Sequence, residues 1–309
     1  NIGFDVHMLR SWGIDLEAQG CTVSDVQHYA ALLDDNRRQF SLDKLAQDYL
    51  QTEKVGKDLD AERMASYHAA DVAPRALSDV QLTGALREAM WPELDAQDLQ
   101  RVRHLEDTVI LPVCEMERNA APLNVPLLKQ WCVETKRIQE ELLYEVAHKV
   151  GFHVNPDASA DWQRLFAHFQ IPVTVLTDKG AASFTDAVLK PIDNPFVQMV
   201  RKAGKLASLR AKFLDAYAAV VGDDGLLRYS LHQLRTEHYG TVRGRFSASN
   251  KNIQQVMNRD THMTSFGDLD FFVRKLFVPQ SGLFFSADAA QIEFRLFAHY
   301  SESARLLQA

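Results

Sequence analysis

The sequence predicts a helix-rich α+β protein, and three observations support this class. Its 309 residues are 46% hydrophobic and 24% charged, which is typical of a globular chain long enough for about two domains. Apolar residues have the spacing of amphipathic helices in residues 127–150 and again around residues 200–214. After a turn at Gly222–Gly225 the pattern changes to short strand-like runs. We therefore expect helices first and strands toward the carboxyl end.

The first region is expected to be acidic and mostly helical. Residues 1–120 contain 12 Lys and Arg against 22 Asp and Glu, whereas residues 121–309 contain 22 against 19. The formal net charge of −7 therefore conceals a weakly basic second part, so the overall charge does not exclude nucleic acid as a partner. Within the first region, Ser41 before Leu42–Leu45 is a helix-start signal.

A long amphipathic helix is predicted over Leu127–Val150, after a boundary at Pro112–Pro126. Two later stretches concentrate positive charge. One is a helix expected around residues 200–214, whose apolar stripe has a basic flank that is either a solvated face or a phosphate-binding surface. The other is Arg228–Arg259, where six cations on loop-rich chain face one acid, Glu237. Cations on loops are harder to explain as the solvated face of a helix, so the pattern favours a functional role for these side chains.

The carboxyl-terminal residues predict a buried strand followed by a helix. Gly282–Asp288 has the pattern of the strand, and the following residues place Ile292, Leu296 and Tyr300 on one helix face. Asp288 would stand where the strand ends, and its carboxylate with an adjacent backbone carbonyl could bind a hard cation such as Mg²⁺. Capping of the next helix is the alternative role for this aspartate.

No run of about 18 apolar residues and no leader-like start is present, so we expect neither a membrane span nor a secretory signal. Three cysteines, Cys21, Cys114 and Cys132, share no metal-binding spacing, and their odd number argues against a disulfide framework. We therefore expect a cytoplasmic protein without a membrane partner.

Two long segments resemble motifs of the family A DNA polymerases. Ser286–His299 resembles the palm motif A, commonly Asp-Tyr-Ser-Gln-Ile-Glu-Leu-Arg, with Ala289 and Ala290 in place of its Tyr and Ser. Thr241–Gln255 resembles the family's upstream Thr-x-x-Gly-Arg-Leu-Ser-Ser motif, in a form seen in many phage polymerases. Because both motifs occur in the right order and spacing, the sequence is identified as a member of this DNA polymerase I-like family. The resemblance implies a bacterial cell as the location, with a phage gene as a candidate source.

The resemblance extends to the amino terminus. Asn1–Asp5 resembles the second motif of the family's 3′–5′ exonuclease domain. Asp79 is the preferred match for the aspartate of the third motif, because Met90–Leu94 follows it as the family's Met-Trp-Pro segment does. Tyr67–Asp71 fits the letters of the motif without this context. The choice of Asp79 puts Arg75 where the family has the tyrosine that orients the attacking water, so we expect weak or absent excision.

The resemblance implies three parts. They are the C-terminal part of an RNase H-like 3′–5′ exonuclease domain over residues 1–110, a helical thumb over 111–225, and the N-terminal part of a polymerase palm over 226–309. Glu117–Asn119 resembles the family's segment that leads into the thumb. The family's fingers, the second half of its palm and the start of its exonuclease domain are unmatched. We therefore expect the sequence to lie inside a larger enzyme, and the isolated chain to bind DNA without activity.

The resemblance also assigns chemistry. In the polymerase site of the parent enzyme, two Mg²⁺ ions would hold the primer 3′-hydroxyl and the deoxynucleoside triphosphate for in-line attack. Asp288 and the carbonyl of Ala289 would be ligands there, and Glu293 would favour deoxyribose by crowding the sugar 2′ position. Asp5 and Asp79 would be two of four carboxylates that hold a second metal pair, in the exonuclease site.

Primer–template DNA and deoxynucleoside triphosphates are the implied partners, and replication accessory proteins are further candidates. Arg245 and Gln254 would hydrogen-bond minor-groove acceptors near the primer terminus, which are present at every correct pair. The basic helix would follow duplex phosphates. The complete predicted DNA-binding set is Arg245, Gln254, Arg243, Asn252, Lys205, Arg210, Lys212 and Arg295. The alternative functions are a catalytically degenerate DNA-binding module and a stand-alone exonuclease.

Overall fold

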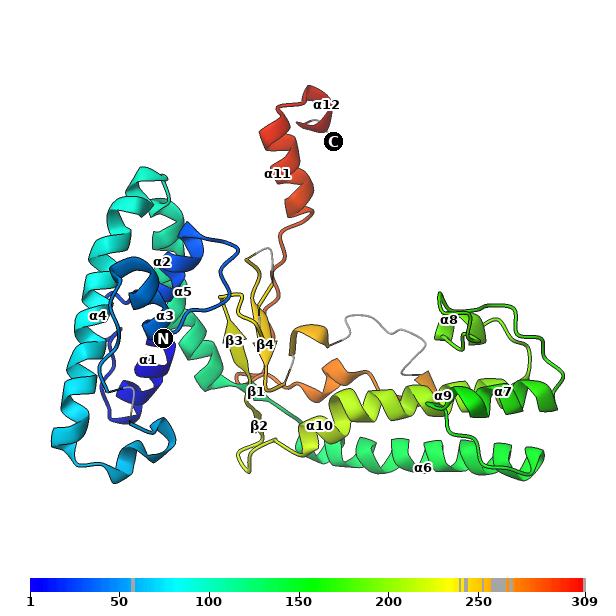
Figure 1. Ribbon diagram of the computed structural model, residues 1–309. Helices are drawn as coiled ribbons and strands as arrows, with labels where there is room; N and C mark the ends of the chain where they lie inside the picture. The colour runs from blue at the N-terminus through cyan, green and yellow to red at the C-terminus, as the bar shows by residue number, and fades with distance from the viewer. Residues whose placement is uncertain are drawn as a thin grey trace. The chain divides into compact units, whose positions relative to one another are not determined.

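The structure is a computed structural model, and it describes residues 1–56, 59–238, 240–241, 244–251, 253–256, 265–266 and 269–307. The chain divides into two compact units, Asn1–Phe277 and Val278–Ala309. Helices make up most of the described elements, so the prediction of a helix-rich chain is confirmed (Figure 1). Within the described residues, no helix has both the length and the apolar character needed to cross a membrane.

Residues 1–119 form an N-terminal helical region. Asp25 and Ser41 accept hydrogen bonds from first-turn N–H groups of the helices that follow them, which satisfies donors that have no partner inside a helix. The helix start predicted at Ser41 is therefore confirmed. Tyr29, Leu86 and Met90 are fully buried where α2, α3 and α4 meet. The elements are α1 (Ile2–Ser11), α2 (Val26–Leu33), α3 (Leu42–Leu45), a π-helix (Ala46–Leu50), a 3₁₀ helix (Ala61–Ser66), α4 (Ala69–Ala96) and α5 (Gln100–Asn119).

Residues 123–225 form a helix-pair region, in which α6 (Val125–Val150) packs along α9 (Pro195–Leu209) (Figure 1). Asn124 caps α6, and Gly151 ends it with a φ of +79°, a left-handed conformation that suits glycine. The helix predicted over residues 127–150 is thus confirmed and begins two residues earlier. The remaining elements are α7 (Ser159–His168), α8 (Asp186–Leu189), a π-helix (Arg210–Leu214) and α10 (Asp215–Ala218).

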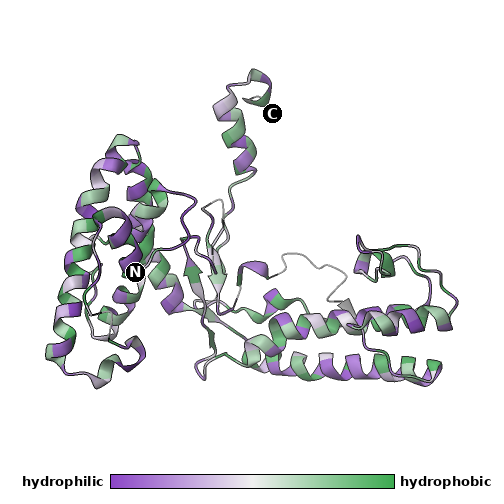
Figure 2. Ribbon diagram, in the orientation of Figure 1, coloured by the Kyte–Doolittle hydropathy of each residue, from purple (hydrophilic) through white to green (hydrophobic). Residues whose placement is uncertain are grey.

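The helix pair is held together by the apolar stripes that the sequence periodicity predicts. Leu128 and Trp131 of α6 pack with Leu206 and Leu209 of α9 in one core. Val146 of α6 belongs to a second core, near the other end of the pair. Figure 2 shows hydrophobic and hydrophilic residues alternating along both helices, as expected when one face of each is buried.

The strands are short and pair antiparallel within the described residues. β1 (Ala121–Pro122) pairs with β2 (Leu226–Leu227), directly before and after the helix-pair region. β3 (Ser230–His232) pairs with β4 (Ser247–Ser249), with Ser230 opposite Ser249. The other elements here are β5 (Ser265–Phe266), β6 (Leu269–Asp270) and two 3₁₀ helices (Ile253–Gln255 and Val273–Leu276). The turn and strand predicted after residue 221 are confirmed.

The second unit contains α11 (Ile292–Ser301) and α12 (Ala304–Leu307). The prediction of a buried strand over Gly282–Asp288 is wrong, because this segment has no strand hydrogen bonds and Phe285 is 92% exposed. A strand needs a neighbour to satisfy its backbone groups, and no described segment pairs with this one. The helix predicted after it is confirmed.

Candidate functional site

Asp288 lies in an exposed segment ahead of α11. Its carboxylate makes no hydrogen bond or ion pair with any described residue, and its side chain is open to solvent. The alternative role of helix cap is wrong, because the N-cap position belongs to Gln291, and no side chain makes a capping hydrogen bond there. Gln291 has a φ of +48°, a left-handed conformation that costs a non-glycine residue about 1 kcal/mol or more. This conformation turns the chain sharply between Asp288 and the helix.

Glu293 and Arg295 follow in the first turns of α11, and both side chains are exposed. Glu293 lies at the positive end of the helix dipole, where a carboxylate is favourable. Ala289 lies directly after Asp288 and is also exposed, so its carbonyl and the Asp288 carboxylate are oxygen donors on one short stretch. Such hard oxygen ligands are the kind that Mg²⁺ prefers.

These donors fit one side of a magnesium site. Among the described residues, no three His, Cys, Asp or Glu side chains come together as a metal site would require. Asp288 and Ala289 would therefore need ligands from substrate, water or residues outside those described. The fit thus rests on the chemistry of the two donors.

The segment predicted to contact the primer terminus is a tight, self-bonded loop beside β4. The hydroxyl of Thr241 accepts from the Arg245 N–H at 2.9 Å and donates to the Arg245 carbonyl at 3.0 Å. The Gln254 amide donates to the carbonyl of Phe246 at 3.1 Å, and both Arg245 and Gln254 have exposed side chains. The last hydrogen bond therefore brings the Gln254 side chain to the residue next to Arg245. Arg243 and Asn252, from the same prediction, lie outside the described residues.

This loop begins at a position that needs glycine. Gly240 has a φ of +93°, and a Cβ added there would lie 2.4 Å from the Leu234 carbonyl oxygen. Its N–H donates to the hydroxyl of Ser247 at 2.9 Å, which ties the loop to β4. Glycine is the residue that tolerates both the backbone angle and the close approach.

The predicted basic helix corresponds to α9 and the π-helix that follows it, and several of its cations form ion pairs within the protein. Lys205 lies 3.0 Å from Asp186, which also pairs with Arg201 at 2.7 Å, and Lys205 is only 10% exposed. Hydrogen bonds from these two cations hold the pKa of Asp186 below its usual range. Arg210 pairs with Asp215 at 2.8 Å, whereas Lys212 is exposed and has no ion pair within the described residues.

The two candidate exonuclease carboxylates lie on different helices of the N-terminal helical region. Asp5 is exposed on α1, and it lines a pocket that also contains Thr83 of α4. Asp79 is also on α4, and its Oδ2 accepts from the Lys54 ammonium at 2.8 Å. The ammonium therefore occupies one oxygen of the carboxylate that the prediction assigns to a metal.

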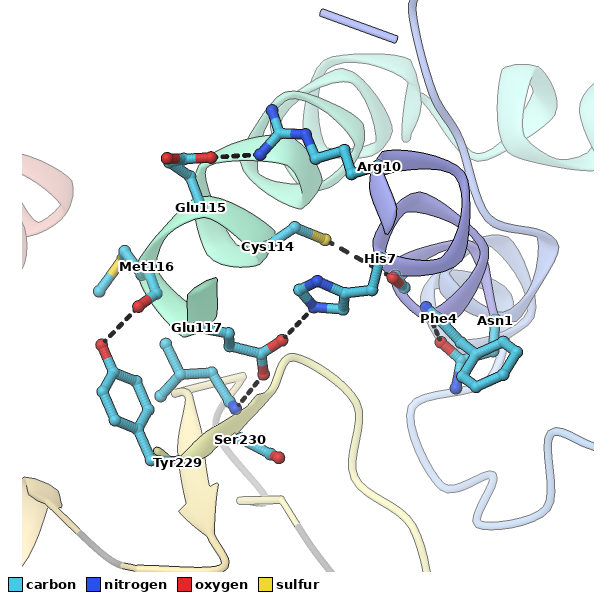
Figure 3. Close-up of polar contacts among 12 residues, drawn as sticks. Asn1, Phe4, His7, Arg10, Cys114, Glu115, Met116, Glu117, Tyr229 and Ser230 are labelled. Carbon is cyan, nitrogen blue, oxygen red and sulfur yellow. Dashed lines mark hydrogen bonds and ion pairs between the residues drawn. The ribbon is translucent and has the colours of Figure 1, made fainter. Parts of the chain in front are cut away.

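Arg75 has a clear structural task. Its guanidinium donates to the carbonyls of Gly56 at 3.1 Å and Leu59 at 2.9 Å, which holds the chain segment that carries Lys54 against α4. Sequence reasoning missed Lys54 and Asp186. Each pairs with a residue more than ten positions away in the sequence, so no local spacing of residues reveals the contact. It also gave no role to Glu117, whose carboxylate joins α5 to α1 and β3 (Figure 3).

Several known proteins resemble this chain in sequence. The family model for DNA polymerase family A matches residues 126–309, which include both predicted motifs. The chain is 28% identical to DNA polymerase DpoZ of Acinetobacter phage SH-Ab 15497 and 29% identical to DNA polymerase DpoZ of Salmonella phage PMBT28, with all of this chain covered in each case. It spans 54% and 53% of the length of those relatives.

A solved structure has the same fold. The POL domain of Pol1 from M. smegmatis, in complex with DNA primer-template and dNTP, superposes with a TM-score of 0.66 over 94% of this chain and 48% of that one, at 24% identity. The similarity reaches beyond the residues that the family model covers, since it includes much of the N-terminal helical region.

Proposed function

This chain belongs to DNA polymerase family A, and from that premise we propose that the enzyme containing it transfers deoxynucleotides to a primer 3′-hydroxyl under the direction of a template. The observation that carries the proposal is the family match over residues 126–309, within which Asp288 stands exposed on a sharply turned segment. The phage sources of both relatives support the further proposal that the enzyme works in the cytoplasm of an infected bacterium.

We assign the chemistry to α11 and the segment before it. Asp288 and the carbonyl of Ala289 would hold Mg²⁺, which, when bound, supplies stabilisation of the negative charge that develops on the phosphates. Glu293 would line the sugar pocket and disfavour a 2′-hydroxyl. Its exposed place in the first turn of α11, five residues after Asp288, supports this role.

We assign primer–template contact to two surfaces. Arg245 and Gln254, both exposed on the loop beside β4, would donate to minor-groove acceptors and so test pair geometry without reading sequence. Lys212 and the cations of α9 would contact duplex phosphates, which makes binding salt-dependent. On this basis residues 111–225 act as a thumb and residues 226–309 as part of a palm.

Substitution of Asp288 tests the polymerase proposal. In the full-length enzyme, Asp288→Ala should reduce nucleotide incorporation by about 10³-fold or more, because a metal ligand stabilises the transition state by several kcal/mol. Primer–template affinity, measured by fluorescence anisotropy, should stay within about twofold because the DNA contacts lie elsewhere.

Glu302→Gln is the matched control, since it removes another exposed carboxylate of the same unit. It should leave incorporation unchanged. Normal incorporation by the Asp288→Ala enzyme would disprove the metal role.

A weakened 3′–5′ exonuclease is the second proposed activity, with residues 1–110 as its remnant. The Lys54–Asp79 pair and the use of Arg75 to hold the Lys54 segment favour low activity, because a fixed ammonium competes with a metal ion for the same carboxylate.

We expect slow magnesium-dependent excision of a primer end by the full-length enzyme, and an increase of several-fold in Lys54→Met. Lys44→Met is the control, because Lys44 pairs with Asp48 in the same region. Brisk excision by the unmodified enzyme, or equal rates in all three proteins, would contradict the proposal.

A further inference from the structure

Glu117, near the end of α5, connects three elements that are far apart in the sequence (Figure 3). Its Oε2 accepts a hydrogen bond from the His7 ring on α1 at 2.8 Å, and its Oε1 accepts from the backbone N–H of Leu231 on β3 at 2.6 Å. The side chain is 18% exposed. Two short, charge-assisted bonds to a shielded carboxylate fix its position more firmly than neutral bonds would.

Further bonds attach the chain around β3 to the same helix. The Tyr229 hydroxyl donates to the carbonyl of Met116 at 3.0 Å, and the Gln233 amide donates to Glu106 at 3.0 Å. Tyr229 is buried, and burial together with the nearby Glu117 charge raises the pKa of its hydroxyl. β3 and the residues on either side of it are therefore attached to α5 at positions 229, 231 and 233, and the contact of the Glu117 carboxylate is the central one.

The position of β3 also determines where the loop that carries Arg245 lies. β3 pairs with β4, and the His232 ring contacts the Ser249 hydroxyl at 2.6 Å across the pair. Beyond the strand, the Asn250 amide donates to the hydroxyl of Ser230 at 2.8 Å. Arg245 lies two residues before β4, so a shift of β3 on α5 would move Arg245 as well.

We propose that Glu117 is a positioning residue for the contacts that test the primer terminus. It holds β3, and through β4 the loop with Arg245 and Gln254, at a fixed place on α5. The inference rests on the proposed polymerase function. Loss of the carboxylate leaves the Leu231 N–H without its partner, so β3 gains freedom and Arg245 loses its set distance from the minor groove.

The test uses the full-length enzyme and compares extension of matched and mismatched primer termini. For Glu117→Ala we expect the ratio of kcat/KM for matched over mismatched ends to fall about tenfold, the effect of one lost hydrogen bond to a charged group. Glu117→Gln keeps an oxygen acceptor for the Leu231 N–H and should restore most of the ratio. Tyr229→Phe, which removes a neighbouring neutral anchor, should lower it by a smaller factor.

Glu115→Ala is the matched control. Glu115 is two residues away on the same helix and pairs with Arg10 of α1, so its loss breaks an ion pair between α1 and α5 without touching β3. It should leave the extension ratio unchanged even if the melting temperature falls as it does in Glu117→Ala.

Equal ratios in Glu117→Ala and the unmodified enzyme, or equal losses in Glu117→Ala and Glu115→Ala, would overturn the inference. If Glu117→Ala does not fold, the comparison of Tyr229→Phe with Glu115→Ala decides in the same way. Absence of any incorporation by the unmodified enzyme would instead refute the proposed function, which separates the two failures.

Discussion

Tyr217 is buried in the core of the helix-pair region, and its hydroxyl finds no hydrogen-bond partner among the described residues. A buried hydroxyl without a partner costs about 1–3 kcal/mol of the free energy of unfolding. Burial also raises the pKa of this phenol from its ordinary value of 10.0 to about 12. The Tyr217 hydroxyl therefore affects both the free energy of unfolding and the way this free energy changes at high pH.

We predict that Tyr217→Phe raises the free energy of unfolding by about 1 kcal/mol at neutral pH. Between pH 10 and 12 the unfolded chain releases the phenolic proton while the folded chain keeps it, so the wild type loses stability as the pH rises through this window. The variant lacks this proton, and its advantage should widen above pH 10. Denaturant unfolding at a series of pH values measures both effects.

Tyr229→Phe is the control for this prediction, because the Tyr229 hydroxyl donates to the Met116 carbonyl. Its loss should lower the free energy of unfolding by about 1 kcal/mol. The same sign of change in both variants would contradict the assignment of Tyr217 as an unpartnered hydroxyl.

At the scale of single residues, sequence reasoning identified side chains in short motifs and missed those defined by distant contacts. Asp288 and Arg245 were predicted because each belongs to a segment that can be read locally. Lys54 was not, since its partner Asp79 lies 25 residues away and only the fold brings the two together. Arg75 was predicted to weaken excision, and its actual contacts with loop carbonyls depend on the same packing.

At the scale of elements, the charged contacts between α8 and α9 limit how many cations α9 has available for the proposed contact with DNA phosphates. Asp186, at the start of α8, forms ion pairs with both Arg201 and Lys205. Its pKa is held below the usual range by these partners, so the carboxylate stays charged in neutral solution and would compete with DNA phosphates for the two cations.

We predict that Asp186→Asn lowers the primer–template Kd about fivefold at low salt, because two cations become available for phosphates. For the same reason, the slope of log Kd against log salt concentration should become steeper by about 1 to 2. Asp157→Asn is the matched control. Asp157 lines one pocket together with Asp186, Arg201 and Lys205, and its loss removes an equal charge without freeing an ion-paired cation. Equal effects of both substitutions would show that net charge alone governs binding.

Elements were predicted well where a long apolar periodicity and caps mark them within their own sequence. The helices of residues 125–150 and 195–209 carry long apolar stripes and clear caps, so periodicity found both. The strand expected over residues 282–288 failed because a strand depends on neighbours that the sequence pattern cannot supply. The β3–β4 pair lies in a stretch where the sequence indicated extended chain without its partners.

At the scale of the whole molecule, the two units differ in how far their apolar side chains are buried. Among its described residues, Asn1–Phe277 contains four buried cores, whereas Leu283, Phe285 and Tyr300 of the second unit are each more than 80% exposed. Exposed large apolar groups of this kind favour association between copies.

We predict that the 309-residue chain self-associates at micromolar concentration and that a chain of residues 1–277 stays monomeric. Phe285→Ser in the longer chain should reduce the association without altering the melting temperature, since its side chain is 92% exposed. Light scattering coupled to size-exclusion chromatography measures both. Monomeric behaviour of the longer chain would count against this expectation.

The pairing of β1 with β2 has a consequence for how this protein can change. Ala121 lies opposite Leu227, so the chain leaves for the helix-pair region and returns from it at adjacent positions on one small ladder. The core near the far tips is made of residues of this region alone, whereas the core near the ladder also contains Phe271, Val273 and Leu276 from later in the chain. We therefore expect insertions and deletions at the far tips of the region to be tolerated, while the core beside the ladder keeps its geometry.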